Sequence, residues 1–349
     1  MIMVGAIAAT LWVIGAVMKV PNAARWNMLA VLFAGVVIVQ LVLPAGHPLR
    51  MATGADARLW AILFGFAVLI WGYRKLLGNL RVRAKPPQAQ PEKPDQFSAT
   101  ELDRYARHII LREVGGPGQK ALRHSRVLVL GAGGLGSPAL QYLAAAGVGT
   151  IGVIDDDIVE NANLQRQVIH LDRNIDEPKV HSAAEMMMAQ NPFVTVRPYH
   201  RRLDAENAES LFADYDLVLD GTDNFDTRYL ANETAVATKT PLIAAALTQW
   251  EGQISLYDPK RGTPCYACIF PQAPDPSLVP SCAEAGVIGP LPGVIGAMMA
   301  VEAIKVITGA GEGLGGRLLI YDALYAQTRV IAVKPDPDCR VCQGRGAAP

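Results

Sequence analysis

The stretch that decides the fold is Arg126–Gly136, RVLVLGAGGLG, in which a short apolar run leads directly into a glycine-rich turn. The run predicts a buried β-strand over Arg126–Leu130, and the residues after the turn predict a helix over Ser137–Ala146. The turn satisfies the pattern G-x-G-x-x-G with Gly131, Gly133 and Gly136. Glycines let the backbone approach phosphates closely, and a helix N-terminus supplies amide donors and a positive dipole. The stretch therefore predicts a nucleotide-binding unit of a doubly wound α/β domain.

A second predicted strand, Thr150–Ile154, ends in a carboxylate. Asp155 follows this strand directly and lies 19 residues after Gly136. At this spacing a carboxylate can accept hydrogen bonds from the ribose hydroxyls of a bound nucleotide. A glycine turn and an acidic residue indicate only that a nucleotide binds, so an NAD-dependent dehydrogenase fits this part of the chain equally well.

Polar residues further along the chain favour phosphate chemistry over hydride transfer. An enzyme that attacks the α-phosphate of ATP needs fixed cations and Mg²⁺, because negative charge grows on that phosphate and on the leaving pyrophosphate. A nicotinamide enzyme has no such need. Each of these residues alone could be a solvated surface charge or a helix cap. Only their occurrence together, in this order along the chain, favours phosphate chemistry. The set is Asn163, Arg166 and Lys179 after the second strand, and Asp223 and Asn224 after a third apolar strand, Leu217–Asp220.

The C-terminal half predicts an extension of the sheet. Gln253–Asp258, Arg317–Asp322 and Gln327–Val333 are rich in β-branched and aromatic residues, and short turns separate the last two. We expect these strands to be antiparallel, which makes the sheet mixed. Leu291–Thr308 is apolar and helical, but Glu302 within it favours a buried core helix over a membrane span.

Four of the five cysteines form two C-x-x-C pairs, Cys265/Cys268 and Cys339/Cys342. Four thiolates in this arrangement fit a closed tetrahedral Zn²⁺ site, which would be structural because no position remains for water or substrate. The alternative is a redox role for either pair. An odd cysteine count with this pairing suits a reducing compartment better than a disulfide framework.

The N-terminus carries the apolar excess of the chain. Hydrophobic residues make up 51% and charged residues 18% of the sequence. Three apolar runs, Ile2–Met18, Met28–Leu43 and Leu59–Tyr73, approach the length of membrane-spanning helices and have tryptophans near their ends. We expect two or three transmembrane helices.

Basic residues set the expected orientation of these helices. Arg74, Lys75, Arg81, Arg83 and Lys85 follow the third run, which places that end in the cytoplasm. The proline-rich segment Ala84–Asp95 predicts a disordered linker. The expected organisation is a membrane anchor over residues 1–83, a linker over 84–96 and a cytoplasmic enzyme domain over 97–345.

Seven segments stand in the following order along the chain, together with the two C-x-x-C pairs: LDRYARHIIL (102–111), GAGGLG (131–136), IDDDIVENANLQRQVIH (154–170), EPKV (177–180), DGTDNFDTRYLAN (220–232), EGQISLY (251–257) and CAEAGVIGPLPGVIG (282–296). In this order they resemble the MoeB/ThiF/HesA adenylyltransferases, which are relatives of the ubiquitin-activating enzymes. The resemblance covers about Phe97 to Gln343, and within the family it is strongest to the molybdopterin-synthase adenylyltransferases. It implies a doubly wound, Rossmann-like core with a mixed sheet.

The resemblance implies roles for individual residues. Asp155 would hold the ribose, and Asn163 and Arg166 would contact the phosphates. Lys179 would stabilise charge at the α-phosphate, and Asp223 would be the carboxylate linked to Mg²⁺. The implied nucleotide-binding positions are Gly131, Gly133, Gly134, Gly136, Asp155, Asn163, Arg166, Lys179, Asp223 and Asn224.

Two further implied residues concern a partner subunit and the carrier protein. Arg107 would reach across a homodimer into the neighbouring active site. Cys282, in the proline-rich segment Ala273–Gly289, has two interpretations: a nucleophile that forms a persulfide or thioester link with the activated carrier, or a small hydrophobe without chemistry. The implied catalytic residues are Arg107, Arg166, Lys179, Asp223 and Cys282.

These observations predict ATP-dependent adenylylation of the C-terminal glycine carboxylate of a ubiquitin-like sulfur-carrier protein. The carboxylate is already ionised, so no general base is needed, and His170 and His181 are expected to be structural. The resemblance favours the small subunit of molybdopterin synthase as the carrier, and the carrier of the thiamin pathway is the alternative. Since only a short tail follows Cys342, a separate sulfurtransferase is expected to supply sulfur.

Alternatives from other classes are a membrane-bound NAD-dependent dehydrogenase and a non-catalytic scaffold. The dehydrogenase would leave Arg166, Lys179 and Asp223 without roles, and a scaffold would have no need of the same set. Nucleic acid is not an expected partner, because 32 basic and 32 acidic residues give a net charge of zero.

Overall fold

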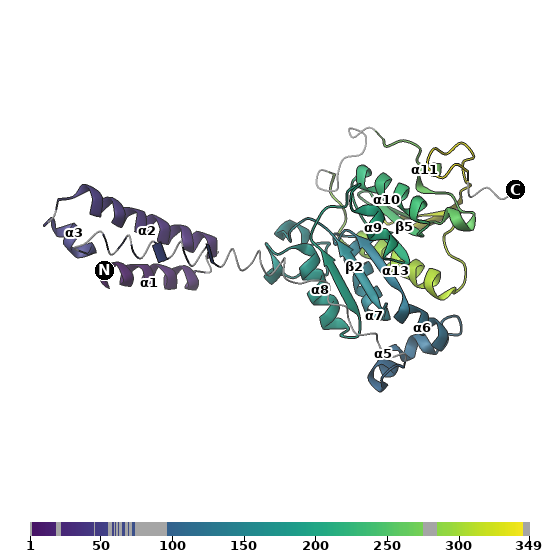
Figure 1. Ribbon diagram of the computed structural model, residues 1–349, viewed down its shortest axis with the longest axis horizontal. Helices are drawn as coiled ribbons and strands as arrows, with labels where there is room; N and C mark the ends of the chain where they lie inside the picture. Colours follow the sequence, from purple (N-terminus) through teal and green to yellow (C-terminus); the bar gives the residue numbers. More distant parts are fainter. Residues whose placement is uncertain are drawn as a thin grey trace. The chain divides into compact units, whose positions relative to one another are not determined.

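A computed structural model describes residues 2–18, 22–44, 46–54, 96–274 and 285–344, together with isolated positions between 58 and 73. The chain divides into two compact units, Met1–Pro94 and Asp95–Pro349 (Figure 1). The predicted linker and most of the third predicted membrane helix, Leu59–Tyr73, lie outside the described residues.

The described residues of the first unit include two long apolar helices and a short one. Helices α1 (Ile2–Val17) and α2 (Asn22–Val42) pack against each other, and α3 (Pro48–Thr53) follows them. Trp12 of α1 and Trp26 of α2 meet edge to face, with ring centroids 5.1 Å apart. The segment Ala24–Val42 is long and apolar enough to cross a membrane, whereas the apolar part of α1 is shorter.

An eight-stranded mixed sheet forms the centre of the second unit, in the order β3-β2-β1-β4-β5-β6-β7-β8. Strands β1 to β5 pair in parallel, and β6, β7 and β8 add antiparallel neighbours. The prediction of a doubly wound core with a mixed sheet is therefore confirmed. The strands are β1 (Arg126–Leu130), β2 (Thr150–Ile154), β3 (Thr195–Tyr199), β4 (Leu217–Asp220), β5 (Leu242–Leu247), β6 (Glu251–Tyr257), β7 (Arg317–Asp322) and β8 (Gln327–Ala332).

Helices cover both faces of this sheet. Side chains of a strand alternate between faces, and Val127 and Val129 of β1 enter one core while Leu128 and Leu130 enter the other. Residues of α6, α7, α8 and α13 build the first core, and residues of α9, α10 and α11 build the second. The helices are α5 (Ala99–Ile109), α6 (Gly115–His124), α7 (Gly136–Ala146), α8 (Lys179–Gln190), α9 (Ala208–Ala213), α10 (Phe225–Thr238), α11 (Tyr266–Ile269) and α13 (Pro290–Thr308), with 3-10 turns η1 (Asn161–Asn163), η2 (Asp172–Asn174) and η3 (Pro259–Arg261).

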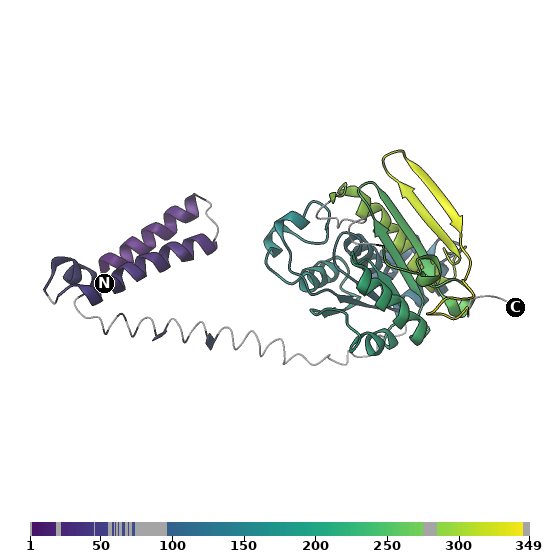
Figure 2. The same ribbon diagram turned by 90° about the horizontal axis from the view of Figure 1, so that it is seen from above.

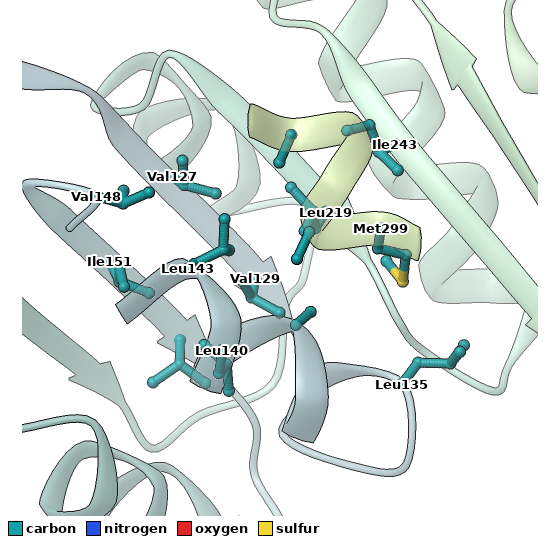
Figure 3. Close-up of a cluster of buried hydrophobic side chains, with 14 of the residues drawn as sticks. Val127, Val129, Leu135, Leu140, Leu143, Val148, Ile151, Leu219, Ile243 and Met299 are labelled. Atoms are coloured by element: carbon teal, nitrogen blue, oxygen red, sulfur yellow. The ribbon is translucent and has the colours of Figure 1, made fainter. Parts of the chain in front are cut away.

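Helix α13 is apolar and long enough to pass for a membrane span, but it belongs to the core. Met299 of this helix points into the same cluster as Leu219 and Ile243 of the central sheet (Figure 3). The buried carboxylate of Glu302 accepts hydrogen bonds from the Lys305 ammonium and a loop amide, so its charge is compensated inside the protein. The predicted core helix is therefore confirmed.

Candidate active site and metal centre

A cavity of about 600 Å³ opens at the carboxyl ends of the parallel strands. In a doubly wound sheet this edge binds ligands, at the point where the strand order reverses, which here lies between β1 and β4. Residues that follow β1, β2, β3 and β4 all contribute to the wall. Eight predicted positions line it: Gly131, Gly133, Gly134, Asp155, Arg166, Lys179, Asp223 and Asn224.

The glycine turn places the start of α7 at this cavity. Gly131 has φ of 89°, which favours glycine, and a Cβ on Gly136 would overlap the carbonyl oxygen of Gly131. The Ala132 amide donates a 2.7 Å hydrogen bond to Asp155 Oδ2, which ties the turn to the end of β2. The turn is therefore closed tightly enough for its backbone amides and the helix N-terminus to face an anion.

Asp155 is partly buried beside this turn. Its Oδ1 accepts a 2.9 Å hydrogen bond from the Asp157 amide, so each carboxylate oxygen has one backbone partner. Burial raises the pKa of Asp155, and the charge of Lys179 and these amides oppose the rise. Each oxygen keeps a further lone pair that a ribose hydroxyl can use. The ribose role of Asp155 remains a prediction.

Lys179 stands at the first position of α8, and its side chain is only 7% exposed. Its ammonium group lies 2.8 Å from Asp157 Oδ2, whose carboxylate is largely exposed at the cavity. Asp157 therefore fixes the lysine at the wall. Asp157 was not among the predicted site residues, although it lies two residues after the predicted ribose carboxylate in the segment that carries the family resemblance.

Arg166 and Asn163 are placed differently from each other. Arg166 is partly exposed at the cavity, where one guanidinium nitrogen donates a 3.1 Å hydrogen bond to the Ala162 carbonyl. Asn163 is buried behind the wall, and its Oδ1 accepts a 2.8 Å hydrogen bond from Gln167 Nε2. Arg166 therefore lies at the cavity, whereas Asn163 stabilises the segment that contains Arg166.

The turn after β4 is held by a buried ion pair that was not predicted. Asp220 is fully buried and accepts hydrogen bonds from the amide and hydroxyl of Thr222. The Arg228 guanidinium lies 3.8 Å from the other carboxylate oxygen and donates to the Thr222 carbonyl at 2.6 Å. Asn224 caps α10, accepting a hydrogen bond from a first-turn amide. Asp223 therefore projects to the cavity from a turn that is fixed at both ends.

The other two predicted catalytic residues are Arg107 and Cys282. Arg107 is exposed on α5, outside the cavity wall. Cys282 lies outside the described residues. The roles of both residues remain predictions.

The two C-x-x-C pairs converge on one cluster. The Sγ atoms of Cys265 and Cys268 are 3.8 Å apart, Cys265 to Cys339 is 3.6 Å, and Cys268 to Cys342 is 3.4 Å. These separations are too long for disulfides, and four thiolates about 2.3 Å from a tetrahedral Zn²⁺ would be about 3.8 Å apart. The four ligand atoms all lie within 4.8 Å of one another. The residues therefore fit a structural zinc site.

This cluster is linked to the cavity through α10 and α11. Asn232 of α10 accepts a hydrogen bond from the Tyr266 amide and donates a long one to Cys265 Sγ. Tyr266 lines the cavity, and its ring lies 5.7 Å from the Arg228 guanidinium. Burial raises the pKa of the Cys268 thiol to about 11, so a metal must displace protons when it binds.

His170 braces the glycine turn, as expected for a structural histidine. Its Nε2 lies 2.9 Å from the Ala132 carbonyl oxygen, and its Nδ1 lies 2.9 Å from the Ser182 hydroxyl of α8. A carbonyl can only accept, so Nε2 carries the proton and Nδ1 accepts from Ser182 in the neutral ring. Burial, aided by the charge of Lys179, lowers the pKa of His170.

The lowered pKa of His170 predicts that its contribution to folding stability decreases at acidic pH. Folding favours the neutral ring, so its contribution is complete above the ordinary pKa of about 6.5 and is lost as the pH falls through and below that value. His170→Gln should cost about 1–3 kcal/mol at pH 7.5 and should flatten the fall in Tm between pH 7 and 5. Thermal unfolding of wild type and His170→Gln between pH 5 and 7.5 measures both effects. His124→Gln, at an exposed position, is the control. An unchanged acid slope in His170→Gln would contradict the assignment.

Together, the doubly wound sheet, the closed glycine turn and the acidic and basic groups at the switch point define a nucleotide-binding enzyme of the α/β class. The fold is similar to that of E. coli MccB crystallised with AMPCPP and MccA, with a TM-score of 0.61, 24% identity, and 68% of this chain and 74% of that chain covered. This likeness concerns the fold alone.

Sequence comparison specifies the family. The chain is 50% identical to the SAMP-activating enzyme E1 of Haloferax volcanii over 246 residues, covering 70% of this chain and 90% of that protein. It is 49% identical to the sulfur carrier protein adenylyltransferase of Thermus thermophilus over 251 residues, covering 71% and 93%. The ThiF family model matches residues 105–341, and the chain belongs to this family. It is a nucleotidyltransferase, which sets aside the dehydrogenase alternative.

Proposed function

We propose that this protein uses ATP to adenylylate the C-terminal glycine carboxylate of a ubiquitin-like sulfur-carrier protein. The observation that carries the proposal is the cavity, where Asp155, Arg166, Lys179 and Asp223 surround a closed glycine turn. A relative that is 49% identical over nearly its whole length bears the name sulfur carrier protein adenylyltransferase.

The geometry suits attack on the α-phosphate. The glycine turn and the start of α7 hold the phosphates, and Asp155 holds the ribose beside them. The carrier carboxylate attacks the α-phosphorus, a P–O bond to the new acyl group forms, and the bond to the leaving pyrophosphate breaks. Lys179 and Arg166 stabilise the negative charge that grows on both phosphates. Asp223 would hold Mg²⁺, which supplies charge neutralisation when it is bound.

An apolar rim beside the cavity suits a protein substrate. It consists of the exposed side chains of Trp250, Ile288, Leu324 and Tyr325. The Ile288 amide donates to the Gln249 carbonyl, and the Ala323 amide to the Trp250 carbonyl, so backbone hydrogen bonds join three chain segments here. Residues 248, 251 and 287 of these segments line the cavity. The hairpin of β7 and β8 stands at the edge of the sheet (Figure 2). A carrier seated on this apolar rim would direct its tail into the cavity.

Within this class we infer that the carrier is the small subunit of molybdopterin synthase. The inference rests on the resemblance of the ordered segments to the molybdopterin-synthase adenylyltransferases. The carrier of the thiamin pathway is the alternative, and the residues at the cavity suit either one because both tails end in glycine.

The test is ATP–pyrophosphate exchange by the full chain with each purified carrier. Exchange with the molybdopterin-synthase carrier and only weak exchange with the thiamin carrier is the expected result. Trp250→Ala should raise the KM for the carrier about tenfold or more and leave ATP binding unchanged. Met188→Ala, which removes an exposed apolar side chain from α8, is the matched control. Exchange with neither carrier would refute the proposed function.

We also propose that the first unit anchors the enzyme in the cytoplasmic membrane. The support is the apolar length of α2, the pairing of α1 with α2, and the basic residues between Arg74 and Lys85. Those residues would place the enzyme domain on the cytoplasmic side. Retention of the full chain in membranes after alkaline carbonate extraction checks the anchor, and its release into the soluble fraction would contradict it.

We also propose that the enzyme acts as a homodimer. Arg107 is exposed on α5 and does not line the cavity of its own chain, so a catalytic role requires a second copy. Mixing Arg107→Ala with Lys179→Ala tests this directly. Partial recovery of exchange in the mixture is expected, because half of the sites in a mixed dimer would be intact. No recovery would contradict the role of Arg107.

A further inference from the structure

A pair of arginines lies at the cavity without an assigned role. Arg201, Arg202 and Leu203 follow β3 and form part of the wall. This segment adjoins the predicted ribose carboxylate, because the Asp155 amide donates a 3.2 Å hydrogen bond to the Tyr199 carbonyl. His200 Nε2 lies 3.1 Å from the Asp156 carbonyl oxygen, which joins the two segments at a second point.

The sheet order indicates which part of ATP reaches this segment. The glycine turn after β1 receives the phosphates, and Asp155 after β2 receives the ribose. β3 lies on the far side of β2 from β1, and Tyr199 pairs with Ile154. A nucleotide that runs from β1 across β2 therefore brings its base to the wall that follows β3. The phosphates and the base lie at opposite ends of this path.

The two arginines differ in their contacts. The Arg201 guanidinium lies over the Tyr199 ring, 5.6 Å from its centroid. Arg202 makes no side-chain hydrogen bond or ion pair with any residue in the described part of the chain, and it is exposed at the cavity. The next residue, Leu203, is buried and fixes the backbone at this point. Arg202 is therefore the member of the pair whose guanidinium plane is available to a ligand.

We propose that Arg202 contacts the base of the bound nucleotide by stacking its guanidinium plane on the adenine ring, an inference that rests on ATP being the substrate. A guanidinium is planar, delocalised and weakly hydrated, so it stacks on aromatic rings better than an ammonium group does. Stacking uses the face of the base and not its hydrogen-bonding edge. Arg202 therefore increases affinity for adenine nucleotides regardless of how many phosphates they carry.

Charge and stacking predict different results for two substitutions. Arg202→Lys keeps the positive charge but loses the plane, and Arg202→Ala loses both. If Arg202 stacks, both variants should bind ATP and AMP about tenfold more weakly, by the same factor for each nucleotide. If Arg202 instead attracts phosphate, Arg202→Lys should restore binding, and Arg202→Ala should weaken ATP much more than AMP.

The experiment is calorimetric titration of the full chain with ATP and with AMP, alongside pyrophosphate exchange. Arg126→Ala is the matched control, because Arg126 pairs with Asp216 at the opposite end of the parallel strands, and wild-type affinity is expected for it. Wild-type affinity in Arg202→Ala, rescue by lysine, or a loss confined to ATP would each overturn the stacking role. If the proposed adenylylation activity itself is wrong, the result is different, because the wild-type chain would then support no exchange at all.

Discussion

Asp223→Ala is expected to lower ATP–pyrophosphate exchange by about 10²–10³-fold with either carrier. The reason is that Asp223 is the carboxylate at the cavity that would hold Mg²⁺ beside the phosphates. Without it, the charge that develops on the leaving pyrophosphate would lose the neutralisation that Mg²⁺ supplies. The KM for Mg-ATP should rise as well, because Asp223 would hold the ion that accompanies the triphosphate. Steady-state exchange at several Mg²⁺ concentrations measures both effects.

The structure supplies a close control for this substitution. Asp226 is an exposed carboxylate in the first turn of α10, three residues further on and not at the cavity wall. Asp226→Ala removes the same charge from the same helix terminus and should leave exchange within about twofold of wild type. Because Asp220 and Arg228 hold the turn from behind, Asp223→Ala should unfold at nearly the wild-type temperature. Near-normal exchange in Asp223→Ala would refute the metal assignment.

The parts of the fold that sequence reasoning predicted are those with strong local patterns. Strands β1, β2, β4 and β7 have the predicted bounds, because apolar β-branched runs bordered by turn residues give an unambiguous strand signal. Helix α7 begins at Gly136, one residue before the predicted start, since the last glycine of the turn already has helical geometry.

Strands β3 and β5 were not predicted, and both have misleading local patterns. β3 contains Pro198, which cannot donate to a ladder but is tolerated because β3 is an edge strand. β5 reads LIAAAL, and alanine favours helices, so its strand form depends on burial between β4 and β6. Edge position and burial are tertiary properties, which no window of sequence contains.

In the candidate site, too, some features could be predicted from local sequence and others depend on tertiary structure. The glycine turn and the carboxylates at strand ends could be found from spacing, because the carboxyl ends of parallel strands meet at one edge. The pairing of Lys179 with Asp157, and of Arg228 with Asp220, could not. These partners lie 22 and 8 residues apart. A bridge between Ile158 and Pro178 brings Lys179 to Asp157, and the turn after β4 brings Arg228 to Asp220, so both pairings depend on the folded chain.

Cys265→Ser is expected to release the metal and to lower the Tm of the second unit by about 10 °C or more. Loss of a structural metal belongs to the large destabilising effects, on the order of 4 kcal/mol, and a domain of this size shifts by about 2–4 °C per kcal/mol. Cys265 and Cys342 are fully buried, so a serine hydroxyl would replace a ligand where no water can substitute. Zinc content and thermal unfolding of the full chain measure the two effects.

Loss of the metal from the cysteine cluster should also affect the active site. Tyr266 follows Cys265, lines the cavity and packs near Arg228, which holds the turn that carries Asp223. A zinc-selective chelator, with Mg²⁺ kept in excess, should therefore lower both Tm and exchange in the wild type, and added Zn²⁺ should restore both. Cys282→Ser should keep the metal and the wild-type Tm. If the pairs instead served redox chemistry, an oxidant or reductant would shift Tm while chelation would not, and full zinc content in Cys265→Ser would rule out the four-thiolate centre.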